Sequence, residues 1–393
     1  MTHTPSYLKT HGWINFTIPT NKFPAKLWIL LGECQSKCSH IAGTPLQPSV
    51  AQNLHLLYLA KGILATTAIE GNTLSEEEVL QHLHGDLKLP ASRDYLKQEI
   101  DNILPECNRM TDVVNSGKTL SIDVATIKSI NKAILKNLSL QEGVLPGVIR
   151  NHTVRVGRYT GAPHEECEYL LHKLCDWLAL EFEAQTGMEI VFAIIKAVVA
   201  HLYLAWIHPF GDGNGRTARL VEFQILNNSG IPAPACHLLS NHYNLTRAEY
   251  YRQLDYASAS GGDILPFLTY SVQGLSDGLR SQIEHIRKQQ MDIVWRNYVH
   301  EQFRDKNQKS DIRKKHLVLD LPDPLIIIPI SQISQISART AVAYSKTTTR
   351  TVYRDIADLA NMKLIMIIDG GIIANKEIIS AFLPVKADPS NNK

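Results

Sequence analysis

The stretch from His208 to Arg219 constrains the fold of this chain more than any other, because it interrupts an apolar run with a glycine-rich segment. It reads His-Pro-Phe-Gly-Asp-Gly-Asn-Gly-Arg-Thr-Ala-Arg. Pro209 has no amide hydrogen and disfavours helical geometry at the residue before it, so the incoming helix should end at His208. The glycines permit positive φ angles and let a ligand approach the main chain closely. A second helix is expected from about Gly215, so the stretch predicts a helix, a tight loop and a helix.

The side chains of this loop suit the binding of a polyphosphate. Backbone amides at the start of the second helix form an anion site. Arg216 and Arg219 are three residues apart on one face of the first turn, where cations oppose the helix dipole and call for an anion. Asp212 is a hard oxygen ligand suited to Mg²⁺ that bridges phosphates. His208 titrates near neutrality in its ordinary state and is suited to accept a proton at the loop mouth.

Two simpler interpretations of the loop are weaker. Asp-Gly-Asn-Gly is often only a turn. A calcium loop of the EF-hand type requires a carboxylate at its last position, which, counted from Asp212, is occupied by Phe223. Calcium is therefore rejected, and the complete spacing of the charged residues favours the phosphate site.

The string resembles the signature of the Fic family, His-x-Phe-x-Asp/Glu-Gly-Asn-Gly-Arg-x-x-Arg, at every specified position. The resemblance implies transfer of AMP from ATP to a hydroxyl side chain of a target protein, with Mg²⁺ as cofactor. It implies that His208 is the catalytic base, that Asp212 is the metal ligand, and that Arg216 and Arg219 bind the outer phosphates. The residues that it assigns to ATP binding are Gly211, Asp212, Gly213, Asn214, Gly215, Arg216, Arg219 and Tyr250.

An upstream segment, Thr66-Thr67-Ala68-Ile69-Glu70-Gly71, fits a second motif of the family, Ser/Thr-x-x-x-Glu-Gly/Asn. The resemblance implies an inhibitory helix, opened in this motif by Thr66, whose Glu70 pairs with Arg219 and displaces the γ-phosphate of ATP. Alone, the segment would read as a helix with a glycine after its last turn. Together with the catalytic loop, it favours inhibition.

Residues 143–163 differ from their helical surroundings, since Thr153 to Gly157 alternate as a strand does. This segment resembles the β-hairpin flap of Fic proteins, on which a target segment adds as an extra strand. The resemblance assigns target docking to Val154, Arg155, Val156 and Gly157. A plain surface hairpin is the alternative, and its position before the catalytic loop favours the flap.

Tyr250 and Tyr251 resemble the tyrosine doublet that lines the adenine pocket in the family, and Tyr250 is the expected nucleotide contact. A tyrosine pair within a helix is also compatible with simple core packing. Ser258 departs from the asparagine that the family often has at this place, so one polar contact of the base is not expected here.

The fold class expected from these features is mainly α: a Fic-type helical bundle with a β-hairpin flap, plus a small α+β domain of the winged helix-turn-helix type. A length of 393 residues predicts two or three domains. Their expected bounds are 1–110 for a helical region with the inhibitory motif, 111–275 for the Fic core, 276–320 for a helical linker and 321–393 for the winged-helix-like domain. The expected helices are 25–39, 50–69, 92–116, 121–137, 165–183, 189–207, 216–228, 246–258, 267–306, 337–343 and 350–362, with a hairpin at 364–374.

In the winged-helix-like domain, Lys346, Arg350 and Arg354 are placed where they would face phosphates. Basic residues are nonetheless few, and Asp355 and Asp358 share the second helix. We therefore expect residues 337–374 to contact protein, in preference to DNA. A homodimer is one such contact.

Composition limits the remaining classes. A net charge of +2 does not indicate a protein coated with nucleic acid. The apolar run 190–207 is long enough for a membrane span, but Lys196 and His201 interrupt it, so a buried core helix is expected and no membrane. The first residues carry no basic region before an apolar core, and no signal peptide is expected. The six scattered cysteines lack zinc-site spacing and fit a reducing, cytoplasmic setting.

Three functions remain at this point. The first is a protein adenylyltransferase held off by Glu70. The second is a hydrolase that removes AMP, with Glu70 positioning a water. The third is a DNA-binding regulator that uses the nucleotide site as a sensor, for which the base His208 would be superfluous. The sequence therefore favours the first, without fixing the direction of the reaction.

Overall fold

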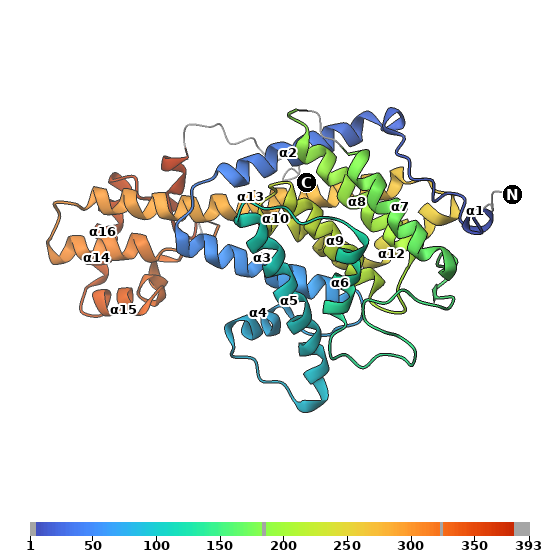
Figure 1. Ribbon diagram of the computed structural model, residues 1–393. Helices are drawn as coiled ribbons and strands as arrows, with labels where there is room; N and C mark the ends of the chain where they lie inside the picture. Colours follow the sequence, from blue (N-terminus) through green and yellow to red (C-terminus); the bar gives the residue numbers. More distant parts are fainter. Residues whose placement is uncertain (1–4, 183–185, 323–324, 381–393) are drawn as a thin grey trace. The chain divides into compact units, whose positions relative to one another are not determined.

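The computed structural model describes residues 5–182, 186–322 and 325–380, and they are mainly helical, as the sequence predicts. The chain forms two compact units that divide between Ile283 and Glu284 (Figure 1). The expected helical region 1–110 and Fic core 111–275 share one hydrophobic core and form the first unit together.

The helices of the first unit are α1 (Tyr7–Thr10), α2 (Ala25–Gly43), α3 (Pro48–Ala68), α4 (Glu76–His84), α5 (Asp94–Asn115), α6 (Val124–Ile134), α7 (Cys167–Leu180), α8 (Glu189–Ile207), α9 (Asn214–Asn228), α10 (Ala233–Cys236), α11 (Leu238–Leu245), α12 (Arg247–Ala259) and the first part of α13 (Leu265–Gln302). Short 3₁₀ helices lie at Thr20–Lys22, Ala91–Arg93 and His164–Glu166. The segment α11 was not predicted, and the predicted end of a helix at residue 183 lies outside the described residues.

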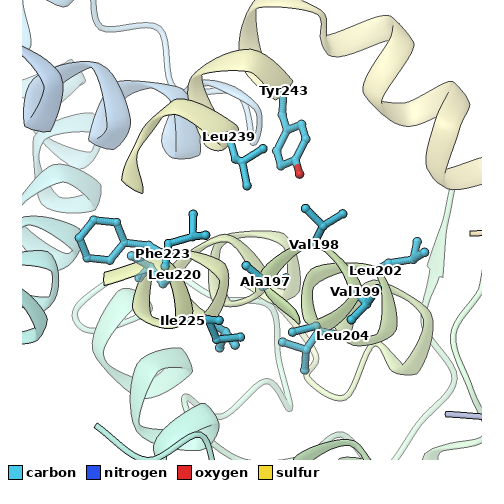
Figure 2. Packing of buried hydrophobic residues seen from close by; sticks show 14 of the residues in the cluster. Ala197, Val198, Val199, Leu202, Leu204, Leu220, Phe223, Ile225, Leu239 and Tyr243 are labelled. Carbon is cyan, nitrogen blue, oxygen red and sulfur yellow. The ribbon is translucent and has the colours of Figure 1, made fainter. Parts of the chain in front are cut away.

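Helix α8 is the centre of the first unit, since almost every side chain from Val191 to Ile207 is buried. Helix α9 packs along it, and Figure 2 shows Leu239 and Tyr243 of α11 pointing toward this pair. Burial of one large aliphatic side chain contributes roughly 1.5–3 kcal/mol, so this row holds α9 firmly against α8. By length and composition α8 is the one described helix that could cross a membrane, and 78% of its apolar window is buried inside the unit. It is a core helix, as predicted.

Helix α3, which carries the second motif, is part of the same core. It packs against α4, α5, α9, α10 and α11. Gly62 permits the closest approach, because a Cβ atom there would lie 2.2 Å from Nδ1 of His237. Ser75 then starts α4 with a reciprocal capping box formed with Glu78, which turns the chain away from the end of α3.

The predicted hairpin is present as β1 (Arg155–Val156) paired antiparallel with β2 (Tyr159–Thr160). Gly157 has φ +58° and opens the two-residue turn, the conformation that such a tight turn requires. On the far side of β2, Nε2 of His11 lies 2.8 Å from the carbonyl oxygen of Thr160, so an N-terminal segment supports the hairpin.

The second unit contains the end of α13, α14 (Lys309–Asp320), α15 (Ala338–Tyr344), α16 (Thr349–Asn361), β3 (Ile365–Ile368) and β4 (Gly371–Ala374), with 3₁₀ helices at Ile330–Gln335 and Lys376–Ile379. Its core includes Trp295, Phe303, Leu317, Ile356 and Leu359. Residues 276–320, expected as a linker, thus supply part of this core. The charged residues of this segment indicated a solvated helix. Helix α14 within it nevertheless packs against α15 and α16.

Helices α15 and α16 are joined by a four-residue turn, and the hairpin of β3 and β4 follows. Ile328 adds a third short strand segment through two main-chain hydrogen bonds with Ile372. Gly371 makes this approach possible, because a Cβ atom there would lie 2.1 Å from the carbonyl oxygen of Ile328. The helix, turn, helix and hairpin expected in this region are therefore present, and the winged-helix class remains a prediction.

Candidate active site

The loop between α8 and α9 has the predicted form. Helix α8 ends at His208, which adopts a left-handed conformation with φ +50°, and Gly213 at φ +73° precedes α9. The side chain of Asn214 closes the loop on itself: its Oδ1 accepts from the amide of Phe210 at 2.9 Å, and its Nδ2 donates to the carbonyl of Phe210 at 2.8 Å. Asn214 therefore fixes the shape of the loop.

The loop forms one wall of a cavity of about 640 Å³, a size typical of small-molecule sites. The hairpin, the end of α3 and α12 supply the other walls. The lining residues that the sequence assigned to the site are Glu70, Val154, Val156, Gly157, His208, Gly211, Asp212, Gly213, Asn214, Gly215, Arg219 and Tyr250. Most of the predicted site residues are thus brought together on one cavity.

His208 lies on this cavity with its Nδ1 3.3 Å from the carbonyl oxygen of Ala205. With the proton on Nδ1, the other ring nitrogen, Nε2, is the one able to accept a proton. Burial, together with the positive charge of Arg150, lowers the pKa of His208 to about 4. The ordinary, near-neutral pKa assumed from the sequence is therefore wrong for the protein without ligand, because the ring is removed from water. The imidazole is neutral at pH 7 and ready to accept a proton.

Arg150, which the sequence did not single out, holds the end of α8 in place. Its guanidinium donates to the carbonyl oxygens of His208 at 2.7 Å and His152 at 2.6 Å, and to that of Ala162. Its backbone amide donates to the carbonyl of Pro209 at 3.0 Å. The side chain is buried and so joins the catalytic loop to the base of the hairpin.

Arg219 is committed to the end of α3. Its Nε donates to Oγ1 of Thr66 at 2.8 Å, and its Nη2 donates to the carbonyl of Thr66 at 3.0 Å and to Oε1 of Glu70 at 2.6 Å. Burial opposes ionisation of Glu70, but the charges of Arg219 and Arg216 outweigh it and lower the pKa of the Glu70 carboxyl. The expected pairing of Glu70 with Arg219 is therefore present as an ion pair.

Gly215 makes room for this ion pair. A Cβ atom at this position would lie 2.5 Å from Oε1 of Glu70 and 3.1 Å from Nη1 of Arg219. The glycine in the motif is thus required by the approach of Glu70 as well as by access to the loop amides.

Arg216 points elsewhere. Its Nη1 donates to Oε1 of Glu99 at 2.9 Å and its Nη2 lies 3.3 Å from Oδ1 of Asp212, and it does not line the cavity. Glu99 in turn accepts from Nδ2 of Asn72 at 2.7 Å. The spacing of Arg216 and Arg219 predicted that their side chains share one face of α9. They separate because Arg216 pairs with Glu99, whereas Arg219 pairs with Glu70.

Asp212 is half-exposed and lies on the cavity wall. Its Oδ1 accepts from the amide of Gly213, which orients the carboxylate. Among the described residues no group of three or more His, Cys, Asp or Glu side chains is arranged to hold a metal ion. A Mg²⁺ ion bound through one carboxylate and substrate phosphates needs no such group, so Asp212 fits that kind of site.

Tyr250 lies on the cavity wall and is backed by a buried polar network. Its hydroxyl lies 2.9 Å from Nε2 of His201, whose Nδ1 is 3.3 Å from Oε2 of Glu222. Tyr243 donates to Oε1 of Glu222 at 2.9 Å. Tyr250 is 3% exposed, so both its predicted roles, core residue and pocket wall, are compatible with its position. Tyr251 donates to the carbonyl of Ile69 at 3.3 Å and so contacts the end of α3.

In the hairpin, Val154, Val156 and Gly157 line the cavity, whereas Arg155 is exposed. Arg158 in the turn forms an ion pair with Asp255 of α12 that ties the hairpin tip to the cavity rim. Neither Arg158 nor Asp255 was predicted from sequence, since each is an ordinary surface charge until the tertiary contact is known.

The first unit is thus a helical unit in which a glycine loop, a histidine and an arginine meet on one cavity beside a β-hairpin. Residues 121–226 match the Fic/DOC family. The chain therefore contains a Fic domain.

Relatives and solved structures agree with this assignment. The chain is 29% identical over 238 residues to a protein from Caenorhabditis briggsae named protein adenylyltransferase fic-1, covering 61% of this chain and 43% of the relative. It is 29% identical over 208 residues to protein adenylyltransferase Fic of Nematostella vectensis, covering 53% and 45% of the two chains. It thus spans less than half the length of these relatives.

A Fic family protein from Desulfovibrio desulfuricans G20 matches with a TM-score of 0.56 at 19% identity, over 89% of this chain and 93% of that one. A Fic-domain signalling protein from Bacteroides thetaiotaomicron matches with a TM-score of 0.52 at 21% identity, over 67% and 97%. These likenesses show the fold.

Proposed function

We propose that the first unit is a protein adenylyltransferase that transfers AMP from ATP to a hydroxyl side chain of a target protein. The observation that carries this proposal is the meeting of a neutral His208, the glycine loop and Arg219 on one cavity. The names of the relatives support the same activity. A site for nucleotide sensing alone would not need the base, which is why transfer is preferred.

In the proposed reaction, Nε2 of His208 accepts the proton of the target hydroxyl while the hydroxyl oxygen attacks the α-phosphorus of ATP. The bond between the α-phosphorus and the bridging oxygen breaks, and pyrophosphate leaves with the negative charge. The loop amides at the start of α9 face this charge, and Arg219 is suited to bind the outer phosphates once it is free. General base catalysis of this kind is typically worth about 10²–10⁴-fold in rate.

Asp212 is the proposed ligand of Mg²⁺, which would neutralise part of the phosphate charge when bound. The contacts from the Gly213 amide and from Arg216 already orient this carboxylate. Release of Arg216 from Glu99 would be needed before it could contact a phosphate.

The proposed docking edge for the target is β1, whose residues Arg155 and Val156 are exposed. β2 pairs with one edge of β1, and no other strand in the described parts of the chain covers the opposite edge. A target segment that adds there is held by main-chain bonds, which fix its register without reading much of its sequence.

The ion pair of Glu70 with Arg219 is proposed to restrain this activity. It occupies the arginine that the outer phosphates need and places a carboxylate on the cavity wall, where it repels them. The same observation favours a second function, removal of AMP by hydrolysis, because an ionised Glu70 that lines the cavity is able to orient a water. A cytoplasmic location is proposed as well, supported by six cysteines that are all buried as free thiols.

The test uses ATP labelled on the α-phosphate and the full chain in two forms, Glu70→Gly and Glu70→Gly/His208→Ala. We expect the first to label itself or a target protein in lysate and the second to lose the label by about 10²-fold or more. Binding of ATP should persist in both forms, since other groups build the phosphate site. Equal labelling by the two forms would rule out His208 as the base. Release of AMP from a labelled protein by the wild type, but not by Glu70→Gly, would establish the hydrolase.

A further inference from the structure

The two acidic residues of α16 are each paired with a basic residue of α14. Asp355 is 1% exposed and accepts from Nε of Arg313 at 2.7 Å and from the hydroxyl of Tyr344 at 3.2 Å. Asp358 accepts from Nζ of Lys314 at 3.1 Å. Both carboxylates are thus neutralised by α14. The weakening of a basic surface on α16 that was expected from these two acids is therefore reduced by their pairing with α14.

The face of α16 opposite Asp355 carries positive and neutral groups, and Asp358, paired with Lys314, lies at its edge one turn after Arg354. Arg350, Tyr353 and Arg354 follow the spacing of one helical face and are exposed, and Lys346 is exposed in the turn before the helix. In the described parts of the chain none of these three cations is within ion-pair distance of a carboxylate, whereas Arg313, Lys314 and Arg339 of the same unit are paired. A cationic face without counter-charges calls for an anionic partner.

The arrangement of the helices points to the kind of partner. Helix α15, the four-residue turn and α16 form a helix-turn-helix, with α14 as the third helix of its core. In such units the second helix enters the major groove, and residues near its N-terminus reach phosphates and base edges. Arg350, Tyr353 and Arg354 lie in the first two turns of α16 and are therefore at the required place.

The distribution of charge along the chain supports the same partner. Residues 284–393 contain 17 Lys and Arg against 12 Asp and Glu, for a net charge of +5. Residues 1–283 contain 23 against 26, for a net charge of −3. The chain's overall charge of +2 conceals this division, which concentrates attraction for a polyanion on the second unit.

We propose that the second unit binds duplex DNA through the exposed face of α16, with Lys346 and Arg350 on phosphates and with Tyr353 and Arg354 directed to the groove. Duplex DNA is preferred to a protein partner because this face lies on the second helix of a helix-turn-helix and its cations have no carboxylate within ion-pair distance in the described parts of the chain. The hairpin does not add to the phosphate contacts, since its turn carries Asp369.

The test measures binding of the full chain to a fluorescent mixed-sequence duplex of about 20 base pairs, two helical turns, by anisotropy. The salt concentration is varied from about 50 to about 200 mM, and a non-specific Kd of roughly 10⁻⁶–10⁻⁴ M is expected near physiological salt. In Arg350→Ala/Arg354→Ala the affinity should fall by at least about tenfold, and the slope of log K against log salt should become shallower by about 1, because Arg350 is the one proposed phosphate contact that this variant removes.

The matched control is Arg296→Ala/Arg304→Ala, which removes one exposed cation from α13 and one from the turn that follows it in the same unit, and should keep its affinity. Equal losses in the two double variants would show that total charge, and not α16, determines binding, and would overturn the proposal. Absence of duplex binding at the lowest salt would also overturn it. So would a change in self-association of the α16 variant, measured by sedimentation, with duplex binding unchanged. AMP transfer by the first unit is a separate readout and should not change in either variant.

Discussion

Oε1 of Glu70 lies 2.6 Å from Nη2 of Arg219, a residue 149 positions further along the chain. Thr66 contacts the same guanidinium through its hydroxyl and its carbonyl oxygen, and the Arg219 side chain is only 1% exposed. The arginine expected to bind phosphate is therefore occupied by Thr66 in the last turn of α3 and by Glu70 just after it. The first two predictions examine this contact.

Glu70→Gly should increase the rate of AMP transfer, because Arg219 becomes free for the outer phosphates. The expected gain is about 10- to 100-fold, the size of a modest ion-pair and positioning effect. Glu70→Gly/Arg219→Ala should lose most of this gain. Steady-state kinetics with labelled ATP on the wild type, both single variants and the double variant measure the coupling. Glu76→Ala, which removes a carboxylate at the start of α4, is the control and should leave the rate unchanged. Independent effects of the two substitutions would contradict the idea.

Gly215→Ala should lower the melting temperature of the wild type, because the new methyl group would collide with Glu70. In the Glu70→Gly background that collision is absent, and alanine is favoured over glycine in a helix by up to about 1 kcal/mol. There the same substitution should be neutral or stabilising. Calorimetry on the four proteins is the measurement, and equal shifts in the two backgrounds would show that Glu70 does not occupy this position in solution.

Arg150→Lys in the Glu70→Gly background should reduce transfer by about 10²-fold, because a lysine cannot reach the three carbonyl groups and the end of α8 loses its anchor. Arg150→Ala should do the same and should also raise the pKa of His208, because a nearby positive charge is removed. The acid limb of the pH–rate profile should therefore move upward in Arg150→Ala but not in Arg150→Lys. Arg155→Lys on the exposed hairpin is the matched control for kinetics.

The pH dependence of kcat/KM for Glu70→Gly reports the free enzyme and should show its acid limb well below the ordinary imidazole value of 6.5. His208 works as a base in its neutral form, so activity rises as the pH passes upward through its pKa. Burial lowers the pKa of His208 to about 4. The Glu70 carboxylate raises this pKa, so its removal in Glu70→Gly should not move the acid limb to higher pH. A plateau through neutrality is expected. An acid limb near 6.5 would show that the His208 ring is hydrated in solution.

The sequence predicted the parts of the site that are local in the chain. The form of the loop follows from Pro209 and the glycines, and the pairing of Glu70 with Arg219 follows from two short motifs. Arg150 was missed because its role lies in carbonyl groups brought to it by folding, and a single arginine in a loop carries no such signal. The split between Arg216 and Arg219 was missed because Glu99 is 117 positions away from Arg216.

The second unit gives a different lesson. Asp355 follows Val352 by three residues and precedes Leu359 by four, so it lies on the apolar stripe of α16, and this spacing was visible in the sequence. The cations that neutralise it come from α14, a segment expected to be a linker. The orientation of the acid was therefore predictable, whereas its partner was not.

Glu70, the proposed restraint, follows the end of helix α3, which is packed on five other helices of the first unit with Gly62 against His237. Helix α3 cannot leave without unfolding that unit, so activation must be a local event in its last turn or in the Glu70 side chain alone. Such motions are fast, from about picoseconds for a rotamer change to about microseconds for a fraying turn. If opening costs on the order of 1–3 kcal/mol, the proposed restrained form is open between about 15% and about 0.6% of the time. The protein would then keep a low basal activity that is proportional to the fraction of molecules in the open form. A binding partner that holds the Glu70 side chain away from Arg219 would increase this activity.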